Sequence, residues 1–415
     1  MSEIKAKPHG AIPSDFLPDP EGMLLIGGER ADALAKQAGE TPLFVYDLAI
    51  ARARVAGLRA AMPEGLLIHY AIKANSHPAV LNAMRHVVDG FDVASAGELG
   101  KALAAGMAAD HISFAGPGKR NRELEAAIHA GATLNAESEG EVDRALAIAD
   151  SIGIAPRIAV RVNPDFDLKG SGMRMGGGAK PFGVDAERVP DLVRHIIAAG
   201  ADWRGFHIFA GSQALDPEAI ADTQAQTITL AGRLADAVSA VPPLVNIGGG
   251  LGVPYFPGDS AVDVGFVGDR LAGSLDARAE SLADTIFAME LGRYLVAECG
   301  VYLMRIVDRK VSHGEIFLVT DGGLHHQLAA SGNFGTVIRR NYPIAVASKL
   351  GAAGEEVAHV VGCLCTPLDR LGDAVMLPRA DVGDLVALFM AGAYGASASP
   401  AAFLGHPPAA ELVLG

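Results

Sequence analysis

Short apolar runs alternate with longer Ala-rich amphipathic stretches through the first two thirds of the chain. Each apolar run has the length of a buried strand, and each stretch after it has the length of a helix. Repeated strand–helix units predict a parallel sheet, because parallel neighbours need a crossover connection. About eight units between residues 48 and 287 predict a closed (β/α)8 barrel of the α/β class, with an open doubly wound sheet as the alternative. We expect strands at 66–73, 91–95, 111–115, 132–136, 157–163, 204–210 and 244–247, and helices at 49–62, 78–87, 96–106, 120–130, 139–151, 186–199 and 216–240.

The pattern changes after about residue 288, where helical periodicity disappears and short β-type runs follow one another. This pattern predicts a C-terminal, mostly β domain over residues 288–415. The Pro- and Gly-rich segment 1–47 ends in a short apolar run at 43–46, and we expect it to pack with the β domain. The strands expected in that domain are 301–311, 316–320, 344–348, 356–361 and 385–390.

The composition of the chain indicates which partners it can bind and in which cellular compartment it works. The chain has 415 residues, of which 50% are hydrophobic, as is typical of a globular α/β protein. Its net charge of −14 disfavours nucleic acid and anionic membranes as partners. Three cysteines (Cys299, Cys363 and Cys365) without framework spacing indicate a reduced, cytoplasmic protein, and no metal site is expected from their spacing. The first 20 residues lack the apolar core of a signal peptide, and no run approaches the ~18 apolar residues of a membrane span.

Polar side chains interrupt several of the predicted barrel strands. Lys73 ends the apolar run 66–73, and burial there would lower the pKa of its amine and make it nucleophilic. A structural lysine that reaches for water is the alternative. Because Asp92 and Arg161 lie on two further strands, and buried charges need partners, we expect one polar centre in the barrel lumen.

Glycines at strand ends add a candidate anion site. Gly248, Gly249 and Gly250 follow the run 244–247, and their N–H groups could face a phosphate, although glycine runs also form plain turns. Ser212 stands in a similar strand-end loop and could donate a hydroxyl. The segment 290–293 joins the two domains and offers a Glu and an Arg, which could bind one ligand or form a surface ion pair.

Seven short motifs follow one another along the chain. They are 70–75 (YAIKAN), 91–95 (FDVAS), 161–164 (RVNP), 248–250 (GGG), 290–293 (ELGR), 365–369 (CTPLD) and 392–395 (GAYG). In this order, the set resembles the pyridoxal phosphate (PLP)-dependent decarboxylases of the ornithine, diaminopimelate and arginine type, over roughly residues 40–414.

The resemblance implies an alanine-racemase-like barrel with a β domain, and a homodimer with shared active sites. It implies amino-acid decarboxylation through a Schiff base on Lys73 and a quinonoid intermediate, with Cys365 of the partner subunit acting on the reacting carbon. The same resemblance assigns the phosphate to Gly248, Gly249, Gly250, Ser212 and Arg293, with Tyr394 nearby, and the pyridine nitrogen to Glu290. It places Gly292 among the cofactor-binding residues and gives Asp92 and Arg161 supporting positions.

Two other functions stay open beside decarboxylation. Racemases of this fold place an arginine at the ring nitrogen, so Glu290 favours decarboxylation, in which the cofactor takes up the electron pair that CO₂ leaves behind. A catalytically silent binding protein is the other alternative, which the presence of Lys73 and Cys365 disfavours.

The chain departs from the family around the substrate. Phe209 stands where the family stacks a histidine on the cofactor, and Thr366 stands where related enzymes carry an acid for a substrate ammonium group. Together with Asp369 and His406, Thr366 is a candidate substrate residue. The segments around Cys365 and His406 resemble a subgroup of carrier-protein-linked glutamate decarboxylases and exosortase-associated decarboxylases. A carrier protein is therefore a candidate partner, with Arg339 and Arg340 as a basic patch or a plain solvated loop.

Overall fold

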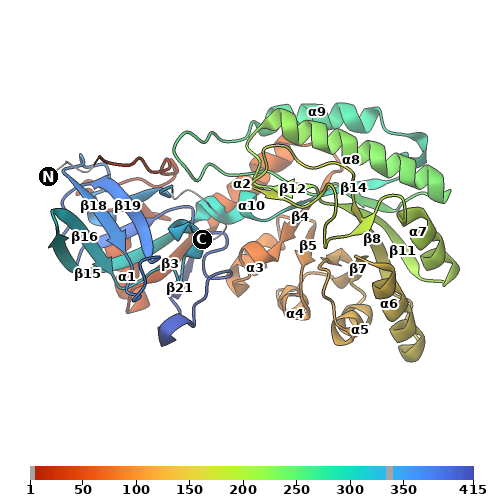
Figure 1. Ribbon diagram of the computed structural model, residues 1–415, viewed down its shortest axis with the longest axis horizontal. Helices are drawn as coiled ribbons and strands as arrows, with labels where there is room; N and C mark the ends of the chain where they lie inside the picture. Colours follow the sequence, from red (N-terminus) through yellow and green to blue (C-terminus); the bar gives the residue numbers. More distant parts are fainter. Residues whose placement is uncertain (1–4, 333–339) are drawn as a thin grey trace. The chain divides into compact units, whose positions relative to one another are not determined.

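The computed structural model describes residues 5–332 and 340–415, with Arg174 by its backbone alone (Figure 1). The chain divides into two compact units. The barrel unit comprises Val55–Val253 and Ala261–Gly292, and the β unit comprises Met1–Arg54, Pro254–Ser260 and Arg293–Gly415. The short segment Pro254–Ser260 belongs to the β unit although it lies between two barrel segments in the sequence.

Eight parallel strands close on themselves in the barrel unit, so the predicted (β/α)8 barrel is confirmed and the open sheet is wrong. Neighbours pair in chain order, and the last strand pairs with the first, with Ala288 opposite Leu67. The strands are β4 (Leu67–Ala71), β5 (Gly90–Val93), β6 (Ile112–Phe114), β7 (Thr133–Ala136), β8 (Arg157–Asn163), β11 (Asp202–Ile208), β13 (Leu244–Asn246) and β14 (Ile286–Leu291).

Helices surround these strands, as Figure 1 shows. Ser95 and Ser138 cap two of them by accepting a backbone N–H in the first turn, as the sequence pattern favours. The helix Val264–Asp276 was not predicted, because its three glycines weaken the helical signal. The helices are α2 (Leu48–Ala61), α3 (Pro78–Met84), α4 (Ala96–Ala104), α5 (Asn121–Ala130), α6 (Glu139–Ile152), α7 (Val189–Ala198), α8 (Pro217–Val238) and α9 (Val264–Asp276).

One local prediction for the barrel is wrong. Strand β4 ends at Ala71, and Lys73 lies in the 3-10 turn Ile72–Ala74 instead of continuing the strand. The buried hydroxyl of Tyr70 donates to the carbonyl of Asn75 at 2.8 Å, which holds this turn against the strand. Lys73 therefore does not share a strand face with His69.

The β unit is built on an eight-stranded sheet, which confirms the mostly β character predicted for the C-terminal part. Strand β3 (Leu43–Asp47) pairs with β15 and β21, so the N-terminal segment is part of this sheet. Strands β19 and β21 were not predicted; in β19, Ala374 has a φ of 52°, which interrupts the regular alternation. The other strands are β15 (Gly300–Ser312), β16 (Glu315–Thr320), β17 (Ile344–Val346), β18 (Glu356–Val361), β19 (Arg370–Leu377), β20 (Leu385–Leu388) and β21 (Ala410–Leu414).

Within the described ranges, every helix is too short or too polar to cross a lipid bilayer.

Candidate active site

A cavity of about 350 Å³ opens at the carboxyl ends of the barrel strands. Parallel barrels carry their chemistry at this end, because loops from every strand meet there. Lys73 follows β4, Arg161 lies on β8, and Glu290 lies on β14. The cavity is lined by Lys73, Ala94, Phe114, Ala115, Gly116, Pro117, Gly118, Lys119, Glu123, Arg161, Met175, Phe182, His207, Phe209 and Glu290.

Lys73 presents its amine to this cavity. Its side chain is 49% exposed, and Nζ lies 3.6 Å from Oε1 of Glu290. The expectation that burial within a strand activates this lysine is therefore wrong, since the 3-10 turn carries the side chain into the opening. The residue is nevertheless the one that the sequence singled out, and its amine is accessible to an aldehyde.

Glu290 is a buried carboxylate that His207 holds in place. Oε2 of Glu290 lies 2.8 Å from Nε2 of His207, and both side chains are nearly inaccessible to water. Burial alone would raise the pKa of Glu290, but the hydrogen bond from His207 and the charge of Lys73 lower it well below its usual range. Glu290 therefore stays ionised, and can keep a ring nitrogen that faces it protonated.

Phe209 lines the same cavity, two residues after His207 and directly after the end of β11. The two rings are nearly parallel, with centroids 6.5 Å apart and an interplanar angle of 13°. A flat, apolar face of this kind can stack on an aromatic ligand without contributing a hydrogen bond.

Arg161 is paired with Glu137, which the sequence reasoning missed. The guanidinium donates to Oε1 of Glu137 at 2.8 Å and lies over the ring of Phe182. Glu137 also accepts from the backbone N–H groups of Gly116 and Gly183, so it joins three segments at the cavity. Glu137 directly follows β7, and this position at a strand end was the signal that could have found it.

Asp92 takes part in a second buried network, on β4, β5 and β6. Ser113 donates to Oδ1 of Asp92 at 2.5 Å, and Nδ1 of His69 lies 3.6 Å from the same oxygen. Burial would lower the pKa of His69, but the charge of Asp92 raises it. The predicted single polar centre is therefore divided into separate buried groups, one with Asp92, Ser113 and His69 and another with Arg161 and Glu137.

Lys119 is a second lysine at this cavity, and it too was missed. Its side chain is 1% exposed, and Nζ donates to Glu141 at 2.7 Å and to the carbonyls of Gly116 and Asn135 at 2.9 Å. These bonds fix the loop that forms one wall of the cavity. The residue escaped notice because it lies in a Gly- and Pro-rich loop instead of an apolar run.

The backbone of the predicted glycine loop after β13 packs more closely than residues with a Cβ atom would allow. Gly248 and Gly250 have φ of +73° and +93°, and a Cβ at Gly249 would meet the carbonyl oxygen of Glu290 at 1.9 Å. In the part of the chain described here, the N–H groups of Gly249 and Gly250 have no acceptor. Amides free in this way fit an anionic oxygen. Ser212 lies in the short strand β12 (Gly211–Ser212) of the same unit.

The β unit holds the predicted Arg293 against two aromatic rings. Its guanidinium carbon lies 4.9 Å from the ring centre of Tyr394 and 5.8 Å from that of Tyr255. Nε of Arg293 is buried and, among the described residues, has no hydrogen-bond partner. An unpaired guanidinium nitrogen of this kind fits a ligand with anionic oxygens.

The predicted Cys365 and Thr366 lie in the loop after β18. Cys365 is exposed, and the hydroxyl of Thr366 accepts from the N–H of Leu368 at 3.3 Å. Asp369 is buried and accepts from the N–H groups of Leu324 and Leu364, so its two oxygens join two loops. The substrate roles of these residues stay predictions.

Two further predicted residues belong to the β unit. His406 lies beside Cys363, with ring nitrogens 3.9 Å from the sulfur. Of the predicted basic pair, Arg339 lies outside the described residues. Arg340 lies over the ring of Phe256 and 3.8 Å from Asp259, and its side chain is 48% exposed.

The residues present fit pyridoxal phosphate. The barrel cavity offers an accessible amine and a buried ionised carboxylate 3.6 Å apart, beside an aromatic face. The glycine loop and Arg293 each offer unpaired donors of the type that phosphate accepts.

Comparison with known proteins agrees with this fit. Residues 49–297 match the family model "Pyridoxal-dependent decarboxylase, pyridoxal binding domain". The chain is 36% identical over 382 residues to the L-glutamyl-[BtrI acyl-carrier protein] decarboxylase of Niallia circulans, covering 90% of this chain and 89% of that protein. It is 31% identical to the diaminopimelate decarboxylase of Methanothermobacter thermautotrophicus, covering 95% and 91%.

A solved structure shows the same architecture over nearly the whole length. Diaminopimelate decarboxylase from Helicobacter pylori, complexed with L-lysine, superimposes with a TM-score of 0.82 at 28% identity, covering 92% of this chain and 94% of that one. The barrel, the accessible lysine and the family match together lead to one conclusion: the chain belongs to the pyridoxal-dependent decarboxylases.

Proposed function

We propose that this enzyme decarboxylates an amino acid that is joined to an acyl-carrier protein through its side-chain carboxyl group. The similar enzyme of Niallia circulans bears a name that specifies a carrier-bound glutamyl substrate. Decarboxylation requires a free α-amino group and a free α-carboxylate. A tether must therefore use the other end of the substrate.

The neutral side chain of Thr366 is the observation that carries this substrate class. A free diamino acid would bring an ammonium group, which needs an acid to offset the loss of water. The hydroxyl of Thr366 offers no charge and already accepts a hydrogen bond inside its loop. An uncharged thioester at that end of the substrate fits a neutral partner better than an ammonium group does.

The chain's own residues supply binding, orientation and proton control. When bound, PLP supplies an aldehyde and a ring that accepts the electron pair left by CO₂. Lys73 provides the attaching amine, and Glu290, held ionised by His207, favours a protonated ring nitrogen. Phe209 provides the stacking face, and Cys365 provides the thiol that returns a proton to the carbon.

Decarboxylation of free diaminopimelate is the second candidate function, since a diaminopimelate decarboxylase matches 95% of the chain. A panel of free L-glutamate, meso-diaminopimelate and γ-glutamyl thioesters of pantetheine and of a carrier protein separates the two. We expect CO₂ release from the thioesters at least about tenfold faster than from either free acid. Equal or faster turnover of diaminopimelate would contradict the proposed substrate.

We further propose a homodimer in which Cys365 of the partner subunit completes each site. The exposure of Cys365 in the single chain supports this arrangement. Mixing inactive Lys73→Ala and Cys365→Ala chains would then restore about a quarter of wild-type activity, because half of the dimers are mixed and each has one intact site of two. No recovery, with subunit exchange shown by a tag, would contradict shared sites.

A further inference from the structure

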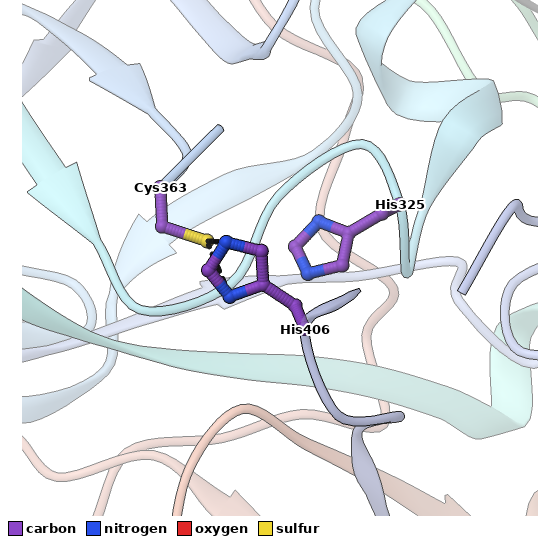
Figure 2. Close-up of side chains that lie close together, drawn as sticks. All are labelled: His325, Cys363 and His406. Atoms are coloured by element: carbon purple, nitrogen blue, oxygen red, sulfur yellow. Dashed lines mark hydrogen bonds between the residues drawn. The ribbon is translucent and has the colours of Figure 1, made fainter. Parts of the chain in front are cut away.

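Three potential metal ligands lie close together within the β unit, and none of them is a residue of the barrel cavity. His325, Cys363 and His406 each offer one ligand atom, and these atoms lie within 4.8 Å of one another. Figure 2 shows the ring of His406 between the sulfur of Cys363 and the ring of His325. The residues come from three loops: after β16, after β18, and after the 3-10 turn Phe403–Gly405.

His325 is a buried histidine without any hydrogen bond in the described structure. It is 0% exposed, and both ring nitrogens lack a partner. The next residue, His326, is its internal control: its Nε2 lies 2.9 Å from the carbonyl of Pro407 and its Nδ1 lies 2.9 Å from the hydroxyl of Tyr302. Because buried polar atoms are almost always paired, the unpaired ring of His325 indicates a missing ligand.

The three loops are already tied together around the cluster. Asp369 accepts from Leu324 at 2.6 Å and from Leu364 at 2.9 Å, which are the neighbours of His325 and Cys363. His326 likewise binds the carbonyl of Pro407, the neighbour of His406. Supports of this kind hold ligands in position before a metal arrives.

Two imidazoles and one thiol are a donor set typical of zinc. Zinc ligands at about 2.0–2.3 Å in a tetrahedron lie roughly 3.5 Å apart, so a contraction of about 1 Å would close the present cluster. The sulfur lies 3.9 Å from both nitrogens of His406, which is too long for a strong hydrogen bond and leaves the group available.

We propose that His325, Cys363 and His406 bind one Zn²⁺ ion and leave its fourth coordination position open. Cysteine spacing gave no sign of this site because the ligands come from distant loops; Cys363 and His406 are 43 positions apart. Cys363 lies two residues before Cys365, so an occupied site restrains the loop that carries that thiol. The proposal is independent of the substrate assignment.

Metal titration of the PLP-loaded full chain tests the site. After a chelator has stripped the protein and has itself been removed, we expect added Zn²⁺ to bind at one ion per chain by elemental analysis. Co²⁺ in its place should give the near-ultraviolet charge-transfer band of a cobalt–thiolate bond. Cys363→Ser should abolish that band, and His325→Gln should weaken Zn²⁺ binding by at least about tenfold. Cys365→Ser and the exposed-residue variant His313→Gln are matched controls that should bind as wild type does.

Circular dichroism of every variant separates loss of the site from loss of the fold. The cobalt spectrum of the wild-type chain needs no variant and decides the matter if a variant fails to fold. Absence of Zn²⁺ binding at micromolar metal, a cobalt spectrum without a sulfur band, or equal loss in Cys365→Ser would each overturn the proposal.

Discussion

Two loops of one cavity each carry a lysine, and the two side chains differ in exposure and in hydrogen bonding. Lys73, after β4, has a side chain that is 49% exposed and an acidic neighbour at 3.6 Å. Lys119, after β6, is 1% exposed and bonded to one carboxylate and two carbonyls. The buried lysine has all its donors in use, whereas the accessible one lies beside the carboxylate that suits the cofactor ring. We therefore expect reactivity to follow accessibility and the neighbouring groups, and burial to mark the structural lysine.

Loss of the Lys73 amine should have the largest effect. We expect Lys73→Ala to remove covalent PLP attachment and to lower turnover by at least about 10³-fold, because no other group at the cavity supplies the same amine. The absorbance of bound PLP and CO₂ release measure the two effects. Folded Lys119→Met protein is the matched control, and it should keep the absorbance band; loss of the band in that control would erase the contrast between the two lysines.

Removal of the Lys119 amine should instead destabilise the fold. Lys119→Met leaves Glu141 buried without its partner, which we expect to cost about 3–5 kcal/mol in the free energy of unfolding. The double variant Lys119→Met/Glu141→Leu should recover most of that loss, since an apolar pair can replace a buried ion pair. Urea unfolding measures both, and a single variant as stable as wild type would show that the pair is not structural.

The ionised state of Glu290 should make the stability of the fold depend on pH below about 4.5. Its pKa is lowered in the folded chain, so its ionised form stabilises the fold above the ordinary value near 4.5, and this contribution is lost as pH falls through the folded value. We therefore expect wild type to lose stability more steeply below pH 4.5 than Glu290→Gln does. Thermal melting of the cofactor-free proteins across that range checks this, and parallel curves would contradict an ionised Glu290.

Truncation of the stacking ring should have the smallest effect. Phe209→Ala removes an aromatic contact worth about 0.5–1.5 kcal/mol, so PLP affinity should fall several-fold while attachment to Lys73 persists. Phe209→Tyr keeps the ring and should bind PLP as wild type does. Equal weakening in both variants would mean that stacking is not the role of this side chain.

The sequence was sufficient for the barrel but only partly for the site. Alternation of strand and helix predicted the eight-unit barrel and seven of its strands, because each unit repeats a strong period. The eighth strand, β14 (Ile286–Leu291), was not among the predicted strands. Lys73 was identified for a wrong reason, since no periodicity shows where a strand gives way to a 3-10 turn. Glu137 and Lys119 were missed because their roles depend on loops that only folding brings together. The same applies to His325, whose unpaired nitrogens can be seen only in three dimensions.

Borohydride reduction of the PLP-loaded enzyme, followed by peptide mass mapping, tests the central claim most directly. Reduction fixes the cofactor to whichever amine holds it. The accessible Lys73 should carry the phosphopyridoxyl mass in nearly every chain, and the peptide that contains Lys119 should be unmodified. The modification on Lys119, or no modification on either lysine, would contradict the account.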